Sequence, residues 1–158
     1  MDQGMHLLDI SYWLLGPVPL HGALLRTSFW NMAVEDNAVV TLAEVDRSAP
    51  WTMFHVSWSE WKNEFALEIY CRRAKLQVLG LGGSYGPQVL RVYEMRPELG
   101  PPDVTKVAFP DEDVSWVGEW RHFREAIAER GRRQLLGDLA SASYALGVVQ
   151  EAYRSVGG

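Results

Sequence analysis

The spacing of the apolar residues changes twice along the chain, and this constrains the fold more than any other feature of the sequence. Between Gly22 and Phe109, large apolar residues alternate with polar ones in short runs separated by turn formers, a pattern typical of β-strands. Before and after this region, apolar residues recur three and four positions apart, which is the spacing of amphipathic helices. The sequence therefore predicts an α+β fold with helices at both ends and strands between them.

The expected elements can be placed by residue range. The first helix is predicted at about residues 3–15 and ends at Gly16-Pro17, because proline cannot continue a helix. Two further helices are predicted at about 113–130 and 138–155. The strands are predicted within residues 22–31, 37–45, 51–61, 65–71, 74–80, 89–95 and 104–109. Their connections are too short for crossover helices, so we expect an open, mainly antiparallel sheet with helices packed on one face.

The third predicted strand carries large apolar groups on both sides. Phe54, Val56 and Trp58 share one side, while Trp51, Met53 and Trp61 share the other. One face of the sheet is expected to lie under the helices, including the stripes that carry Trp116, Trp120, Leu146 and Val149. The other face is too apolar for water, so a homodimer or a higher homo-oligomer through this sheet face is predicted.

Composition excludes several classes of protein. With 158 residues, 47% of them hydrophobic, the chain is expected to fold as a single domain, residues 1–158. A net charge of -5 without a basic stripe argues against a nucleic-acid partner, and no apolar run reaches the ~20 residues of a membrane helix. The only cysteine, Cys71, excludes an internal disulfide; with no recognisable signal peptide, this makes the cytoplasm the expected location. The four histidines lie far apart without the spacing of metal ligands, so no metal is predicted.

The best candidate for chemistry is the pair Asp2 and His6. Their spacing places a carboxylate and an imidazole one helical turn apart on the same face. Such a pair can remove a proton from an alcohol while hydride leaves its carbon. In the alternative reading, Asp2 only caps the helix, and His6 pairs with Asp9 or packs in the core.

The segment GLGGSYG at residues 80–86 is similar in composition to a dinucleotide-binding turn. It fails the strict GxGxxG pattern because Tyr85 occupies the sixth position, and a strand follows it instead of a helix. We therefore interpret it as a connection between strands and expect no cofactor there. Substrate contact by Ser84 or Tyr85 is the remaining alternative.

The segment from Trp58 to Asn63 is a candidate for substrate binding. Tryptophan faces can stack on sugar rings, and lysine or asparagine can form hydrogen bonds with hydroxyls. Trp61 and Lys62 are therefore predicted to contact substrate, together with Tyr85. Core packing or a subunit interface is the competing explanation for most of the seven tryptophans.

Four stretches of the sequence carry a family resemblance. They are DQGMHLLDISYWLLG at residues 2–16, EDNAVVTLAEV at 35–45, HVSWSEWKNEFALEIYCRRAKLQVLGLGGSYG at 55–86 and LASASYALGVVQEAYRSV at 139–156. Together they resemble the C-terminal domain of the Gfo/Idh/MocA family, which includes glucose-fructose oxidoreductase and inositol dehydrogenase. The chain departs from the family pattern at Cys71 and Ala74, where glycines are frequent.

The resemblance implies a function and also a missing part. In that family an N-terminal Rossmann domain binds NAD or NADP, and a lysine of an EKP-type motif acts with an Asp and a His of the C-terminal domain. Asp2 and His6 match these two, so the resemblance implies proton transfer in the oxidation of a sugar, cyclitol or sugar derivative. The chain has neither the Rossmann glycines nor the EKP lysine. We therefore expect no cofactor in this chain and no hydride transfer by it alone.

Several explanations of the missing half stay open at this point. The chain is either a fragment or split product of a parent oxidoreductase, or a stand-alone protein that binds a sugar-like ligand or a partner without redox activity. A purely structural dimerisation module is the third possibility. The sequence does not distinguish NAD from NADP or name the substrate.

Overall fold

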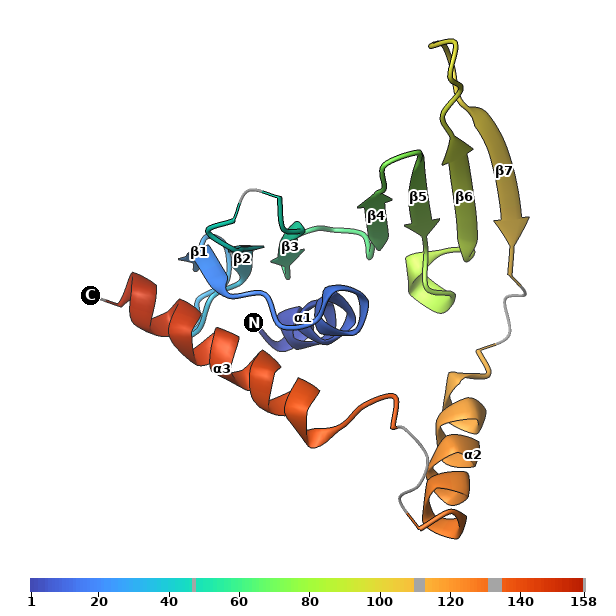
Figure 1. Cartoon of the computed structure of the whole chain (residues 1–158). Coiled ribbons are helices and arrows are strands. Elements are labelled where there is room, and N and C mark those ends of the chain that lie inside the picture. The colour runs from blue at the N-terminus through green and yellow to red at the C-terminus, as the bar shows by residue number, and fades with distance from the viewer. Residues whose placement is uncertain (47, 110–112, 131–134, 158) are drawn as a thin grey trace. The chain divides into compact units, whose positions relative to one another are not determined.

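The computed structural model describes residues 1–46, 48–109, 113–130 and 135–157, and the chain forms two compact units (Figure 1). The first unit combines Met1–Glu60 with the C-terminal segment from residue 135. The second unit begins at Trp61 and includes the chain up to residue 130. None of the helices in these described ranges has the length and apolarity needed to cross a membrane.

The first unit is a three-stranded antiparallel sheet with two helices packed together. Its elements are α1 (Asp2–Leu15), β1 (Leu20–Arg26), β2 (Asn37–Ala43), β3 (Trp51–Ser57) and α3 (Leu139–Val156), with strand order β1-β2-β3. α1 packs against α3 and β3, and α3 also packs against β1. The buried cluster between helices and sheet consists of Leu8, Val18, Val40, Leu42, Ala145 and Val148. This unit therefore holds the hydrophobic core.

The central strand β2 shows why the helices cover one face of this sheet. Ala38, Val40 and Leu42 are buried and alternate with partly exposed residues, as the period of two requires. On the opposite face, Trp51 and Met53 of β3 are 68% and 61% exposed. The predicted division between two faces is confirmed for Trp51, Met53 and Phe54, but β3 ends at Ser57, so Trp58 and Trp61 lie outside the strand that was predicted to carry them. The sheet face away from the helices is open within the described residues of the first unit.

The first strand is shorter than predicted because of a carboxylate. It ends at Arg26, five residues before the predicted limit at Asn31. The backbone N–H groups of Ser28, Phe29 and Trp30 donate to the side chain of Asp36 at 2.8, 2.7 and 2.9 Å. Since these donors are engaged by Asp36, they do not continue a strand ladder, and the chain turns before β2.

The second unit contains a four-stranded antiparallel sheet in sequential order. Its strands are β4 (Ala66–Tyr70), β5 (Ala74–Leu79), β6 (Val89–Glu94) and β7 (Asp103–Ala108). GLGGSYG connects β5 to β6 through the short 3₁₀ helix η1 (Gly83–Tyr85), as predicted. At Gly80, with φ of 72°, an added Cβ would lie 2.3 Å from the carbonyl oxygen of Pro87, so only glycine fits this turn.

Helix α2 (Ser115–Ala128) also belongs to the second unit and buries none of its residues. Its apolar stripe is exposed: Trp116 by 75%, Trp120 by 61% and Ile127 by 62%. The sequence places these residues on one side of a helix correctly, but they cover no sheet within the described chain. Only α1 and α3 supply the helical layer that was predicted.

The predicted α+β class and the antiparallel pairing of the strands are confirmed. In the described part of the chain, seven strands form two sheets of three and four strands, with the break between β3 and β4. All three helices lie within about three residues of their predicted limits. At the start of α3, Asp138 accepts a hydrogen bond from the N–H of Ser141 at 2.9 Å, which caps this helix.

Candidate functional site

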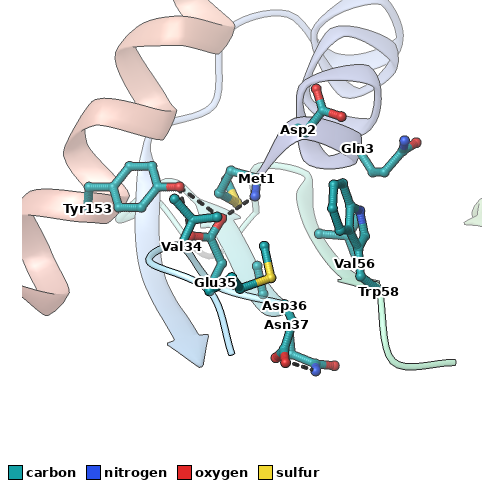
Figure 2. Close-up of a pocket in the computed structure, with 12 residues that line it drawn as sticks. Met1, Asp2, Gln3, Val34, Glu35, Asp36, Asn37, Val56, Trp58 and Tyr153 are labelled. Atoms are coloured by element: carbon teal, nitrogen blue, oxygen red, sulfur yellow. Dashed lines mark hydrogen bonds and ion pairs between the residues drawn. The ribbon is translucent and has the colours of Figure 1, made fainter. Parts of the chain in front are cut away.

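A pocket of about 190 Å³ lies in the first unit at the start of α1 (Figure 2). The start of α1, the segment that leads into β2, the end of β3 and the C-terminal part of α3 all contribute to its wall. Its lining residues are Met1, Asp2, Gln3, Met32, Val34, Glu35, Asp36, Asn37, Ala38, Val56, Trp58 and Tyr153. The pocket thus combines carboxylates, amides, a phenol and an indole on one compact scaffold.

Glu35 contributes a largely buried carboxylate to this wall, with a side chain that is 5% exposed. The hydroxyl of Tyr153 donates to its carboxylate and lies 2.9 and 2.7 Å from the two oxygens. The amino group of Met1 contacts the same carboxylate, and Figure 2 shows both groups converging on it. Burial alone would raise the pKa of Glu35, but the hydrogen bonds from Met1 and Tyr153 outweigh it, so this pKa is lowered.

The same contact changes the titration of the phenol. Burial raises the pKa of Tyr153, and its hydrogen bond to the Glu35 carboxylate raises it further, to about 12. At neutral pH, Glu35 is therefore an anion and Tyr153 a neutral donor. The pair connects the end of α3 with the segment before β2.

Asp36 and Asn37 shape the neighbouring wall. Asp36 is 2% exposed, and the backbone N–H of Ser28 leads the donors that hold its pKa well below the usual range. The amide of Asn37 donates to Asp36 and to the hydroxyl of Ser59, at 3.0 and 2.8 Å. Because the oxygens of Asp36 are already engaged, its role is to hold the loop rather than to bind a ligand.

Trp58 forms the aromatic part of the wall. Its backbone N–H donates to the carbonyl of Asp36, and its own carbonyl accepts a hydrogen bond from the indole of Trp30 at 2.9 Å. The indole of Trp58 remains 53% exposed. An aromatic face held by backbone bonds beside carboxylate and amide groups can take a ring that carries hydroxyls.

Of the predicted pair, Asp2 lines this pocket and His6 is not among the lining residues. Both side chains are exposed on α1, and no hydrogen bond joins them within the described chain. The helix begins at Asp2 and is capped by Met1, without a side-chain hydrogen bond. Helix capping by Asp2 is therefore not observed, and neither is burial of His6 in the core.

The other predicted site residues lie in the second unit. Trp61 is 82% exposed, and Tyr85, in η1, is 37% exposed. The ammonium nitrogen of Lys62 lies 3.5 Å from a carboxylate oxygen of Glu64. The amide of Asn63 donates to the hydroxyl of Ser84 at 2.9 Å. This bond brings the segment that carries Trp61 and Lys62 next to the turn that carries Tyr85.

Sequence reasoning assigned no chemistry to Glu35 or Tyr153. Both lie in stretches that carry the family resemblance, EDNAVVTLAEV and the end of the last helix. They are 118 positions apart in the sequence, and no spacing rule links residues at that separation. Within the described ranges, no group of three or more His, Cys, Asp or Glu side chains could hold a metal ion.

Comparison with known proteins supports the fold. No protein-family model and no curated protein matches the chain. Solved structures do match, among them an oxidoreductase from Agrobacterium radiobacter in complex with NAD+, L-tartaric acid and magnesium, at TM-score 0.72 and 18% identity. UDP-N-acetylglucosamine 3-dehydrogenase GnnA from Acidithiobacillus ferrooxidans matches with a TM-score of 0.71 and 16% sequence identity. The WlbA dehydrogenase from Bordetella pertussis, in complex with NADH and UDP-GlcNAcA, matches with a TM-score of 0.64 and 22% sequence identity.

The extent of these matches is as informative as their quality. They cover 98%, 96% and 98% of this chain but 46%, 44% and 41% of the three structures, respectively. The chain thus spans less than half the length of these oxidoreductases. At such low identity the likeness concerns the fold. The fold that the sequence resemblance predicted is therefore confirmed, since these oxidoreductases share it over nearly the whole chain.

Proposed function

We propose that this chain is the substrate-binding and oligomerisation part of an NAD(P)-dependent oxidoreductase that acts on a sugar, a cyclitol or a sugar derivative. The observation that carries the proposal is the position of Asp2. The residue that the family resemblance assigns to proton transfer lines a pocket, in a fold that known oxidoreductases share over nearly the whole chain.

In this proposal the reaction needs one proton acceptor from the chain. The imidazole of His6 takes the proton of a substrate hydroxyl, and the Asp2 carboxylate, one helical turn away, stabilises the charged ring. Exposure of both side chains suits this role, because the substrate and the cofactor-binding half must reach them. The segment Gly80–Gly86 contains η1 and leads into β6 instead of a long helix, so in this proposal the dinucleotide is bound by the cofactor-binding half.

The substrate is held, in the same proposal, by aromatic and polar groups. Trp61, Lys62 and Tyr85 are exposed to a ligand, and the Asn63–Ser84 bond keeps their two segments adjacent. Their stacking and hydrogen-bonding groups suit a polyol ring. The named ligands of the similar structures, among them UDP-GlcNAcA and tartaric acid, are hydroxylated molecules, which supports this substrate class.

Oligomerisation is assigned to the open face of the three-stranded sheet. Leu24, Trp51 and Met53 on this face are 48%, 68% and 61% exposed. Large apolar groups gathered on one open face favour an interaction surface, and a two-fold dimer would bury them against a second copy.

The test uses the longest natural reading frame that contains this chain. Its product is expected to reduce NAD or NADP with a sugar, a cyclitol or a nucleotide sugar as substrate. His6→Ala should lower its turnover at least ~100-fold, as for a lost acid-base group. His21→Ala, an exposed histidine on β1, is the matched control and should leave turnover unchanged. Normal turnover of the His6 variant, or no nicotinamide reduction with any member of the panel, would contradict the proposal.

A further inference from the structure

The four-stranded sheet of the second unit has two chemically different faces. Antiparallel register places alternate residues on opposite sides. One side is apolar and carries Leu67, Ile69, Leu76, Val78, Leu90 and Val92. The other, here named the polar face, carries Glu68 and Tyr70 on β4, Lys75 and Gln77 on β5, Arg91 and Tyr93 on β6, and Lys106 on β7.

The single carboxylate of the polar face is fully engaged at one edge. Glu68 lies 2.6 Å from the ammonium of Lys75 and accepts hydrogen bonds from Tyr70 at 2.5 Å and Gln77 at 2.7 Å. These contacts, with Lys75 first, lower the pKa of Glu68 to about 2. Glu68 and Lys75 therefore neutralise each other and leave no negative charge for the rest of the face.

Two cations remain side by side on the other half of the face. Arg91 and Lys106 are directly opposite in the β6–β7 register. Side chains so placed have Cβ atoms roughly 5 Å apart, and like charges in such pairs are destabilising. Arg91 donates to the neutral oxygen of Gln77 at 3.4 Å, and Lys106 has no hydrogen bond or ion pair within the described chain.

Among the described residues of this sheet, no further acid on the polar face compensates these cations. Asp103, on the same strand as Lys106, points to the opposite side in the register and pairs with Arg96. The polar face thus has a net charge of about +2 on a chain of net charge -5. A second copy of the same face would repel it, whereas an anion would relieve the repulsion between Arg91 and Lys106.

We propose that Arg91 and Lys106 form a binding site for the phosphoryl group of a small molecule. Two adjacent cations match a dianion, and the guanidinium offers the paired donors that phosphate accepts. Tyr93 lies next to Arg91 on the same face and donates to Gln77 at 3.2 Å, which fixes its ring beside the site. The site consists of residues of the second unit, whereas the pocket at Asp2 is lined by residues of the first unit, and it does not depend on the proposed oxidoreductase function.

The test measures binding of inorganic phosphate, inorganic pyrophosphate and uridine monophosphate by titration calorimetry at low salt, with chloride as the reference anion. At least one phosphate probe should bind in the millimolar range or tighter. Arg91→Gln and Lys106→Gln should each weaken it about tenfold or more. Arg72→Gln, which removes an exposed arginine from the β4–β5 turn, is the matched control and should not weaken it.

A second readout separates a site from a general charge effect. Without anion, Lys106→Gln should raise the midpoint of thermal unfolding, because it removes the like-charge pair. When pyrophosphate is added, the unfolding midpoint of the wild type should rise, whereas the midpoint of the variant should stay constant. Tighter binding of uridine monophosphate than of phosphate would assign the site to nucleotides, and equal binding would assign it to the phosphoryl group alone. Equal weakening in the Arg72 variant, or no binding of any probe, would overturn the site.

Discussion

Removal of the Tyr153 hydroxyl tests the architecture of the pocket at the start of α1. In Tyr153→Phe the ring and its packing remain, but the Glu35 carboxylate loses a donor that lies 2.7 and 2.9 Å from its oxygens. Hydrogen bonds to charged groups contribute roughly 1.5–3 kcal/mol. Since Tyr153 is 42% exposed, solvent screens part of this, and we expect a loss of about 1–2 kcal/mol in the free energy of unfolding at pH 7.

The pH dependence of this loss follows from the direction of the pKa shift. The pKa of Glu35 is lowered in the folded protein, so its stabilising effect is complete above its ordinary value of 4.5 and disappears as the pH falls through the folded value. Without the phenol, the folded pKa of Glu35 moves upward. The variant should therefore complete the loss of this contribution at a higher pH than the wild type, and the difference between the two should shrink in acid.

The assay is urea unfolding of both proteins at pH 7 and at several acidic values. Tyr70→Phe is the matched control, because Tyr70 also donates to a carboxylate, that of Glu68, but is 73% exposed. Its stability should stay within experimental error of the wild type. Two outcomes would refute the reasoning that burial strengthens the contact between Tyr153 and Glu35. One is an equal loss of unfolding free energy in both variants, and the other is a loss in Tyr153→Phe that does not diminish in acid.

Two further predictions concern the isolated chain. It should bind neither NAD nor NADP measurably, because it lacks a βαβ unit with GxGxxG. Titration calorimetry tests this. A dissociation constant in the low micromolar range would contradict the prediction and would favour Gly80–Gly86 as a cofactor-binding loop. It should also self-associate, with a mass from light scattering of about twice 17.9 kDa or a multiple of it. Met53→Glu should shift this mass towards the monomer, whereas Val45→Glu, at a fully exposed turn position, should not. A monomeric wild type would contradict the assignment of the open sheet face.

The elements of the fold could be predicted because each depends on local patterns. Gly16-Pro17 ends α1, Asp138 caps α3, and the alternation around Val40 identifies β2 as a strand with one covered face. The break between the two sheets could not be predicted in the same way. The strands on either side of it have the same alternation, and pairing partners are not encoded in the period of one strand.

Only part of the candidate site could be predicted from the sequence. Asp2 could be proposed because its spacing to His6 is local. Glu35 and Tyr153 meet across 118 positions of sequence, and their contact depends on how α3 packs beside β1. The shortening of β1 has a similar origin, since Asp36 captures backbone donors eight, seven and six residues earlier. These hydrogen bonds from backbone N–H groups to the Asp36 carboxylate override the strand propensity of Phe29 and Trp30.

The distribution of buried and exposed apolar groups connects the fold to the proposed function. The buried hydrophobic residues of the described chain all belong to the first unit. The seven tryptophans, in contrast, are each at least 47% exposed, which excludes the core-packing explanation within this chain. Indole groups carry large apolar area and become stable on a surface mainly when something covers them. The exposed stripe of α2 and the open sheet face are therefore the surfaces on which the proposed contacts should be tested first.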